Sequence, residues 1–238
     1  SVGSNGLMHE GIISTQLGLP GKPALAEELM VERDIKLADY TQSKLHFTGI
    51  SSARSLELIK NAKEKGIQVT CSVTPYHLLF TEDDLKSYDT NLKVNPPLRG
   101  KEDRDALAEG VKSGLIDAIC SHHLPQDIDH KTVEFEYAEN GMNILQITYS
   151  LLKKALPGIK EETIVNLLSK KPREIFGFAP VTVQKDQPAQ LTLFNPEAEF
   201  TFTKSRNRSK SVNNPFLDSN FIGAAIGIIN GKQVYLNS

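Results

Sequence analysis

Apolar residues in the first half of the chain recur at two alternating spacings, one typical of helices and one typical of strands. The stretches with helical spacing are residues 23–40, 53–65 and 101–113. The short apolar stretches between them, which have the length of buried strands, are residues 44–50, 67–73 and 116–120. Gly66 and Gly114 end the second and third helical stretches. This alternation predicts an α/β fold with parallel strands joined by right-handed crossovers.

The second half of the chain changes from helical to strand patterning near residue 181. Helices are predicted at residues 143–156 and 161–170, and Pro172 follows the second of them. Short strands are then predicted at residues 181–183, 191–194, 200–202, 224–229 and 233–236. Asn230 and Gly231 lie between the last two, which indicates a hairpin. We therefore predict a body over residues 1–180 and a small β layer over residues 181–238.

Only three helix-linked strands are visible in the body. A closed (β/α)₈ barrel needs eight strands and typically about 250 residues. The pattern therefore leaves two alternatives, a smaller open sheet or the back part of a larger barrel.

Composition narrows the function classes. The chain has 238 residues, a formal net charge of −2, 39% hydrophobic and 24% charged residues, which is typical of a globular protein. The charge shows no basic excess, so no nucleic-acid partner is expected. No apolar stretch approaches the roughly 20 residues of a membrane span, so no membrane partner is expected. Cys71 and Cys120 lie in apolar strands, which favours buried thiols in a reducing cytoplasm over a disulfide.

The strand predicted at residues 116–120 is followed by two adjacent histidines, His122 and His123. The ends of barrel strands commonly carry ligands or acid–base groups. If strand geometry continues, the two rings point to opposite sides and at most one faces a site. A polar loop after a strand is the alternative, and these residues alone leave both interpretations open.

Several short motifs occur in a fixed order along nearly the whole chain. They are residues 8–11, 17–23, 26–27, 46–51, 69–71, 93–99, 103–104, 114–117, 170–177 and 214–216. In this order they resemble the C-terminal part of bacterial dihydroorotases, in the cyclic amidohydrolase superfamily. The Asn-Pro-Pro-Leu-Arg segment that begins at Asn95 is the most specific of them, and it favours dihydroorotases over hydantoinases and allantoinases.

The resemblance implies a TIM-type amidohydrolase barrel with a small β-sandwich. Its members bind one or two zinc ions, and a metal-bound hydroxide attacks the ring amide of dihydroorotate and opens the ring. In the reverse reaction, carbamoyl aspartate closes to form the ring. Zinc lowers the pKa of bound water toward about 7 and polarises the carbonyl. The three predicted strands would be barrel strands six to eight. We therefore expect a C-terminal fragment, or one piece of a nicked protein, with an N-terminal complement as partner. A closed eight-stranded barrel in this chain would contradict that expectation.

Two positions depart from the family pattern at expected metal ligands. After strand six the family has His-x-x-His-x-Ser, and the second histidine is replaced by Gly49. After strand eight the family has an aspartate that serves as ligand and general base, and His122 stands there instead. An imidazole accepts a proton near neutral pH but lacks the carboxylate's charge. His46 lies three residues before Gly49, and we expect it on the opposite face of the strand as a packed or hydrogen-bonded residue.

Two further positions are implied as substrate-binding. Asn95 and Gly141 match family residues that lie near the substrate ring. The alternatives are a turn-forming asparagine before two prolines and a glycine at a loop-to-helix turn. We assign His122 as the candidate catalytic residue and no metal ligand within this chain.

Two functions follow from these residues. The first is a dihydroorotase-like cyclic amidohydrolase of pyrimidine biosynthesis with impaired or lost zinc catalysis. The second is a non-catalytic, dihydroorotase-like subunit that scaffolds or stabilises aspartate transcarbamoylase. A homodimer is a further expected assembly, and a hydrolase for another cyclic amide is a weaker third alternative.

Overall fold

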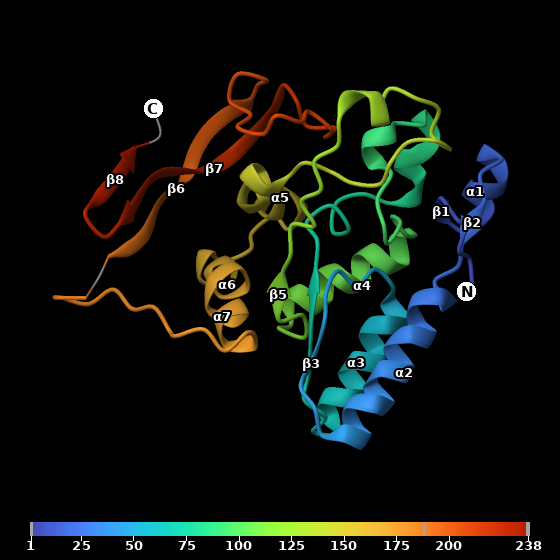
Figure 1. Ribbon diagram of the computed structural model, residues 1–238, viewed down its shortest axis with the longest axis horizontal. Coiled ribbons are helices and arrows are strands. Elements are labelled where there is room, and N and C mark those ends of the chain that lie inside the picture. Colours follow the sequence, from blue (N-terminus) through green and yellow to red (C-terminus); the bar gives the residue numbers. More distant parts are fainter. Residues whose placement is uncertain (1, 188, 237–238) are drawn as a thin grey trace.

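The centre of the molecule is a small parallel sheet. A computed structural model describes residues 2–187 and 189–236. Strands β3 (Leu45–Phe47), β4 (Val69–Val73) and β5 (Ala118–Ile119) pair in parallel in the order β3-β4-β5 (Figure 1). The mixed α/β class predicted from the sequence is confirmed. The strands are shorter than predicted: β3 ends three residues early, β4 begins two residues late, and β5 keeps only two residues of its stretch.

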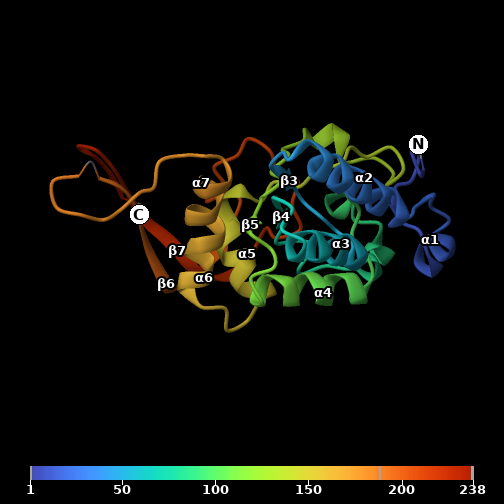
Figure 2. The ribbon, with the colours of Figure 1, turned by 90° about the horizontal axis from the view of Figure 1, so that it is seen from below.

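Three helices cover one face of this sheet. Helices α2 (Leu25–Thr41), α3 (Ala53–Glu64) and α4 (Lys101–Lys112) form where the sequence predicted helices, and they lie side by side (Figure 2). Ser52 begins α3, and its hydroxyl accepts from the Ser55 amide at 3.3 Å. Val69, Cys71 and Val73 are buried and point from β4 into the core under these helices. The Cys71 thiol forms no disulfide. Because side chains alternate along a strand, Thr70 and Ser72 face the opposite side.

The helical segments of the second half differ from the prediction. The predicted helix at 143–156 is a 3₁₀ turn, Leu145–Ile147, followed by α5 (Thr148–Ala155). The predicted helix at 161–170 is longer: α6 (Glu161–Val165) continues through a π-helical turn, Asn166–Lys170, into α7 (Lys171–Ile175). Pro172 therefore lies inside the helical segment. The wider π turn before Pro172 accommodates a residue that has no N–H and whose ring crowds the preceding turn.

The C-terminal residues form a separate antiparallel sheet. It consists of β6 (Gln190–Phe202), β7 (Ser219–Asn230) and β8 (Gln233–Leu236), and β7 packs on α5. The hairpin between β7 and β8 is confirmed. Residues 181–183 form no strand, and the strands predicted at 191–194 and 200–202 are one strand with an irregular register between Asn195 and Glu199. Pro196, which cannot donate to the ladder, lies in that irregularity.

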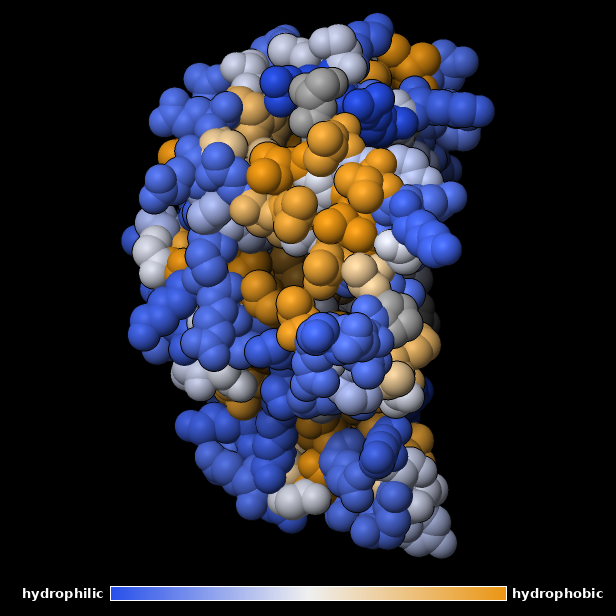
Figure 3. All heavy atoms as spheres, turned by 90° about the vertical axis from the view of Figure 1, so that its left-hand side faces the viewer, coloured by the Kyte–Doolittle hydropathy of each residue, from blue (hydrophilic) through white to orange (hydrophobic). Residues whose placement is uncertain are grey.

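Apolar side chains remain exposed on the β6–β8 sheet. Figure 3 shows them gathered on the side of the molecule where this sheet lies. Leu193, Phe194, Val234 and Leu236 are among the exposed apolar residues. Helix α5 packs on β7 and covers only part of this sheet.

A short N-terminal unit was missed by the sequence pattern. Strands β1 (Met8–His9) and β2 (Gly21–Lys22) pair in parallel around α1 (Ile12–Leu17). Two-residue strands are too short to show a period. Short 3₁₀ turns at Glu82–Ser87, Thr90–Leu92 and Ile128–His130 complete the described elements.

The described residues contain no closed barrel. Their sheets have two, three and three strands. None of the helices in residues 2–187 and 189–236 has the length and hydropathy that a bilayer span requires.

Candidate functional site

Polar side chains line the face of the β3–β5 sheet that is turned away from α3 and α4. His46 Nδ1 lies 2.8 Å from Thr70 Oγ1, and His46 Nε2 lies 3.2 Å from Ser72 Oγ. The register pairs His46 directly with Thr70, so both side chains project from the same face. The expectation that His46 is a hydrogen-bonded strand residue is confirmed.

This row of polar groups continues to the carboxyl ends of the strands. The Ser72 hydroxyl donates to Thr48 Oγ1 at 3.4 Å, and Thr48 Oγ1 lies 3.2 Å from His122 Nε2. The Gly49 amide also donates to Ser72 Oγ, at 3.3 Å. Hydrogen bonds thus connect His46 to His122 through Ser72 and Thr48. We call the end of this row, formed by Thr48, Gly49 and His122, the strand-end rim.

The structure corrects the expected placement of His46 and Gly49. They were predicted on opposite faces of one strand, yet both contact the Ser72 hydroxyl. The alternation fails because β3 ends at Phe47, and Gly49 has a left-handed φ of 68°.

The His122 ring lies directly over Gly49. A Cβ atom added to Gly49 would lie 2.6 Å from His122 Nε2 and 2.9 Å from Nδ1, and closer still to Cε1. His122 itself has a φ of 41°, which is uncommon for a residue other than glycine. The two positions at which the chain departs from the family pattern are therefore in contact.

Burial favours the neutral forms of the titratable groups in this row. Desolvation lowers the pKa of His122 and of His46. For His46, the nearby Asp117 carboxylate opposes that shift. Desolvation also raises the pKa of Cys120, whose thiol interacts with Ser72 and Thr48. A neutral imidazole at position 122 offers one donor and one acceptor nitrogen.

A cavity of about 290 Å³ opens beside the rim. Its lining includes Lys22, Glu27, Thr48, Gly49, Asn95 and Arg99. Asn95 is exposed, and its Oδ1 accepts from Lys22 Nζ at 2.7 Å. The structure thus brings two sequence-predicted positions, Gly49 and Asn95, to one cavity, with His122 against Gly49.

Gly141 lies elsewhere. Its amide donates to the Lys93 carbonyl at 2.9 Å, and a Cβ at this position would lie 2.7 Å from the Leu124 carbonyl oxygen. His123 also faces away from the rim, because its Nδ1 accepts from the Leu145 amide at 3.2 Å. These contacts hold the loop after β5 in place. The substrate-binding role of Gly141 stays a prediction.

The sequence did not predict an ionic cluster that lies in the lining of the cavity beside the rim. Arg99 is buried, and it donates to Ser51 Oγ at 3.1 Å, His9 Nδ1 at 3.1 Å and the Lys22 carbonyl at 2.8 Å. Glu27 lies 3.9 Å from the guanidinium and accepts from the Ser51 hydroxyl. The signal was present, because Arg99 ends the most specific motif and Glu27 lies in another.

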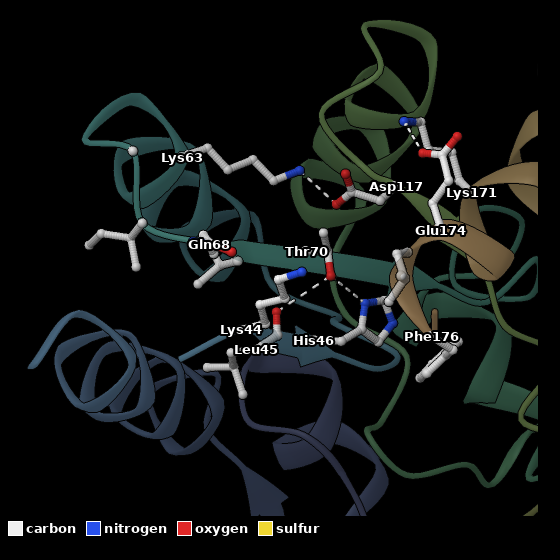
Figure 4. Close-up of a pocket in the computed structure, with 14 residues that line it drawn as sticks. Lys44, Leu45, His46, Lys63, Gln68, Thr70, Asp117, Lys171, Glu174 and Phe176 are labelled. Atoms are coloured by element: carbon white, nitrogen blue, oxygen red, sulfur yellow. Dashed lines mark hydrogen bonds and ion pairs between the residues drawn. The ribbon is translucent and has the colours of Figure 1, made fainter. Parts of the chain in front are cut away.

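A second cavity lies at the opposite ends of the strands. It has about 600 Å³ and is lined by residues that include His46, Thr70 and Phe176 (Figure 4). Two ion pairs line it, since Lys63 lies 2.6 Å from Asp117 and Lys171 lies 2.7 Å from Glu174. Ligands of open parallel sheets bind outside the carboxyl ends of the strands. The strand-end rim, and not this cavity, is therefore the candidate site.

Comparison with curated proteins finds relatives along nearly the whole chain. Proteins named dihydroorotase from Geotalea daltonii and Geobacter metallireducens are 39% and 40% identical to this chain, over 97% of its length. This chain is a homologue of the dihydroorotases. It spans 55% of the length of each of these two relatives, about half of a curated dihydroorotase. No family model matches the chain.

Solved structures place the homologue's fold among amidohydrolases. The L-hydantoinase (dihydropyrimidinase) from Arthrobacter aurescens superposes with a TM-score of 0.82 at 25% identity, over 92% of this chain and 50% of that one. An inactive dihydroorotase-like domain of the CAD-like multifunctional protein of Chaetomium thermophilum has a TM-score of 0.59 at 20% identity, over 84% of this chain and 53% of that one. The second likeness concerns the fold alone.

The homologue's own residues do not fit a zinc ion at the rim, although the family implies one. Zinc sites use histidine, cysteine or carboxylate side chains. Gly49 has no side chain, and His122 Nε2 faces Thr48 Oγ1. Among the described residues, no three histidine, cysteine or acidic side chains are grouped as metal donors.

Proposed function

We propose that this chain is part of a dihydroorotase-like cyclic amidohydrolase, which interconverts dihydroorotate and carbamoyl aspartate. We also propose that its zinc-dependent catalysis is impaired or lost. The sequence identity of 39–40% to dihydroorotases over 97% of the chain supports the assignment to this substrate class. The contact between His122 and Gly49 carries the second part of the proposal.

We also propose that β3, β4 and β5 are strands six to eight of a TIM-type barrel. Residues 1–180 would then be a barrel portion and residues 181–238 a β-sandwich portion. Their parallel order supports this, as does the TM-score of 0.82 to half of a hydantoinase chain.

The substrate would bind in the cavity beside the rim. Dihydroorotate carries a carboxylate, and Lys22 provides positive charge in the cavity lining, where the buried Arg99 is paired with Glu27. Asn95, held by Lys22 Nζ, presents an amide for the ring's own amide groups. In this proposal His122 contributes a neutral imidazole as hydrogen-bonding and proton-accepting group at the rim.

The test compares the full-length protein with the Geotalea daltonii dihydroorotase. Ring opening of dihydroorotate and the reverse reaction are measured with and without added zinc, and ligand binding is measured by calorimetry. We expect binding to persist while turnover falls by roughly 10³-fold or more, because a zinc-activated water contributes several kcal/mol. Equal turnover together with stoichiometric zinc would contradict impaired catalysis. Failure to bind either compound would contradict the substrate class, and co-purification with aspartate transcarbamoylase would then favour the scaffold.

A further inference from the structure

We infer that Gly49 and His122 are a matched pair, in which the His122 imidazole fills the space that any side chain at position 49 needs and serves as a packing group, not as a zinc ligand. The inference concerns the same rim as the proposed function. It rests on packing geometry and not on activity.

The backbone at Gly49 is held in place and has little freedom to move away from the ring. The Gly49 amide donates to Ser72 Oγ, and the next amide, of Ile50, donates to the Ser72 carbonyl at 3.0 Å. Ile50 is buried, and the Ser51 amide donates to Glu27 Oε1 at 3.0 Å. A larger residue at position 49 must therefore displace the ring and not the backbone.

The backbone on the other side of the contact is held as well. His123 forms a bridge with Met142, and the Leu124 amide donates to the Met142 carbonyl at 3.1 Å. His123 is fixed further by the Leu145 amide. The His122 ring can therefore yield only by rotating about its own side-chain bonds, which breaks its contact with Thr48.

This arrangement explains why the two departures from the family occur together. A side chain at position 49 and an imidazole at position 122 compete for one volume. With glycine at 49 the ring settles over the backbone, and Thr48 occupies its Nε2. A zinc ligand needs both a free lone pair and open volume toward the ion, and the pair leaves neither in that direction.

A double-mutant cycle tests the pairing in the full-length protein. Gly49→Ala is made in the parent and in a His122→Ala background, and thermal unfolding is measured for all four proteins. The left-handed φ penalises alanine equally in both backgrounds and cancels in the cycle. We expect Gly49→Ala to lower Tm by roughly 4 °C or more beyond its effect in the His122→Ala background, because only the parent has the ring to displace.

Gly66→Ala is the matched control. Gly66 also has a left-handed φ, 81°, but nothing lies within 4 Å of its added Cβ, so its effect should be the same in both backgrounds. Equal shifts for Gly49→Ala in the two backgrounds would overturn the inference. If Gly49→Ala fails to fold in the parent, its rescue by His122→Ala supports the pairing, and failure in both backgrounds overturns it.

Zinc content provides an independent readout. Zinc per chain is measured by elemental analysis for the parent and for His122→Ala, each purified after incubation with zinc. The inference expects the same stoichiometry in both, because the ring packs and does not ligate. Loss of one zinc ion per chain in His122→Ala would overturn it. Neither readout depends on ring opening, so failure here is distinguishable from failure of the proposed function.

Discussion

Arg99 depends on Glu27 for compensation of its charge. The guanidinium is buried, and burial lowers its pKa while the Glu27 carboxylate opposes that shift. Glu27 also accepts from the Ser51 and Ser52 amides, at 3.0 and 3.1 Å, ahead of α3. One carboxylate thus serves both a buried cation and the start of a helix.

Glu27→Ala should lower the free energy of unfolding by about 3–5 kcal/mol, because removing one partner leaves a buried charge uncompensated. Urea denaturation measures the loss. Glu32→Ala on the same helix is the control, since Glu32 pairs with the exposed Lys36, and a pair of this kind contributes less than about 1 kcal/mol. Equal losses for both variants would show that Glu27 is not the compensating group.

The sequence identified Gly49 and His122 one at a time but not their contact. Each residue stood out because it replaced a family ligand. Their proximity depends on two left-handed backbone conformations, and strand alternation cannot predict those. The same limit explains the wrong placement of His46 relative to Gly49.

At the scale of elements, α5 meets the C-terminal sheet at Gly223. This residue has a φ of 91°, and a Cβ there would lie 2.5 Å from Tyr149 Cε1. The Ser150 hydroxyl donates to the Gly223 carbonyl at 2.6 Å. The absence of a side chain therefore allows β7 to approach the helix.

Gly223→Ala should lower the free energy of unfolding by about 2–5 kcal/mol, from the left-handed φ and from the clash with Tyr149 together. Gly231→Ala in the β7–β8 hairpin is the control. Gly231 has a φ of 62° and open space around its added Cβ, so only the backbone cost of about 1–2 kcal/mol applies. Chemical denaturation separates the two, and matching losses would mean that β7 does not depend on this close approach.

Elements with several turns were predictable, and short or irregular ones were not. Helices α2, α3 and α4 have enough periodic positions to be located within a few residues. The π turn ahead of Pro172 was not predictable, because its hydrogen bonding depends on how the proline ring fits into the helical segment around it. Strand β1, with two residues, exists because β2 pairs with it.

At the scale of the whole molecule, folding lowers the pKa of five histidines. Burial lowers the pKa of His9, His46, His77, His122 and His123. His77 has the largest shift, from 6.5 to about 4. Its Nε2–H donates to the Pro96 carbonyl at 3.1 Å, so Nδ1 accepts from the Thr74 hydroxyl at 2.7 Å. Protonation would remove that acceptor in a buried site.

Acid should therefore destabilise the fold between about pH 6.5 and pH 4. A histidine whose folded pKa is lowered binds its proton more readily in the unfolded state, so stability is complete above pH 6.5 and falls as the pH drops toward 4. For His77 alone the shift corresponds to roughly 3 kcal/mol. Calorimetric unfolding at several pH values should show this loss. His77→Gln should flatten it, because the Gln amide still donates to the Pro96 carbonyl but does not titrate, while His130→Gln changes an exposed side chain and is the control. A pH profile unchanged by His77→Gln would show that its burial does not govern acid stability.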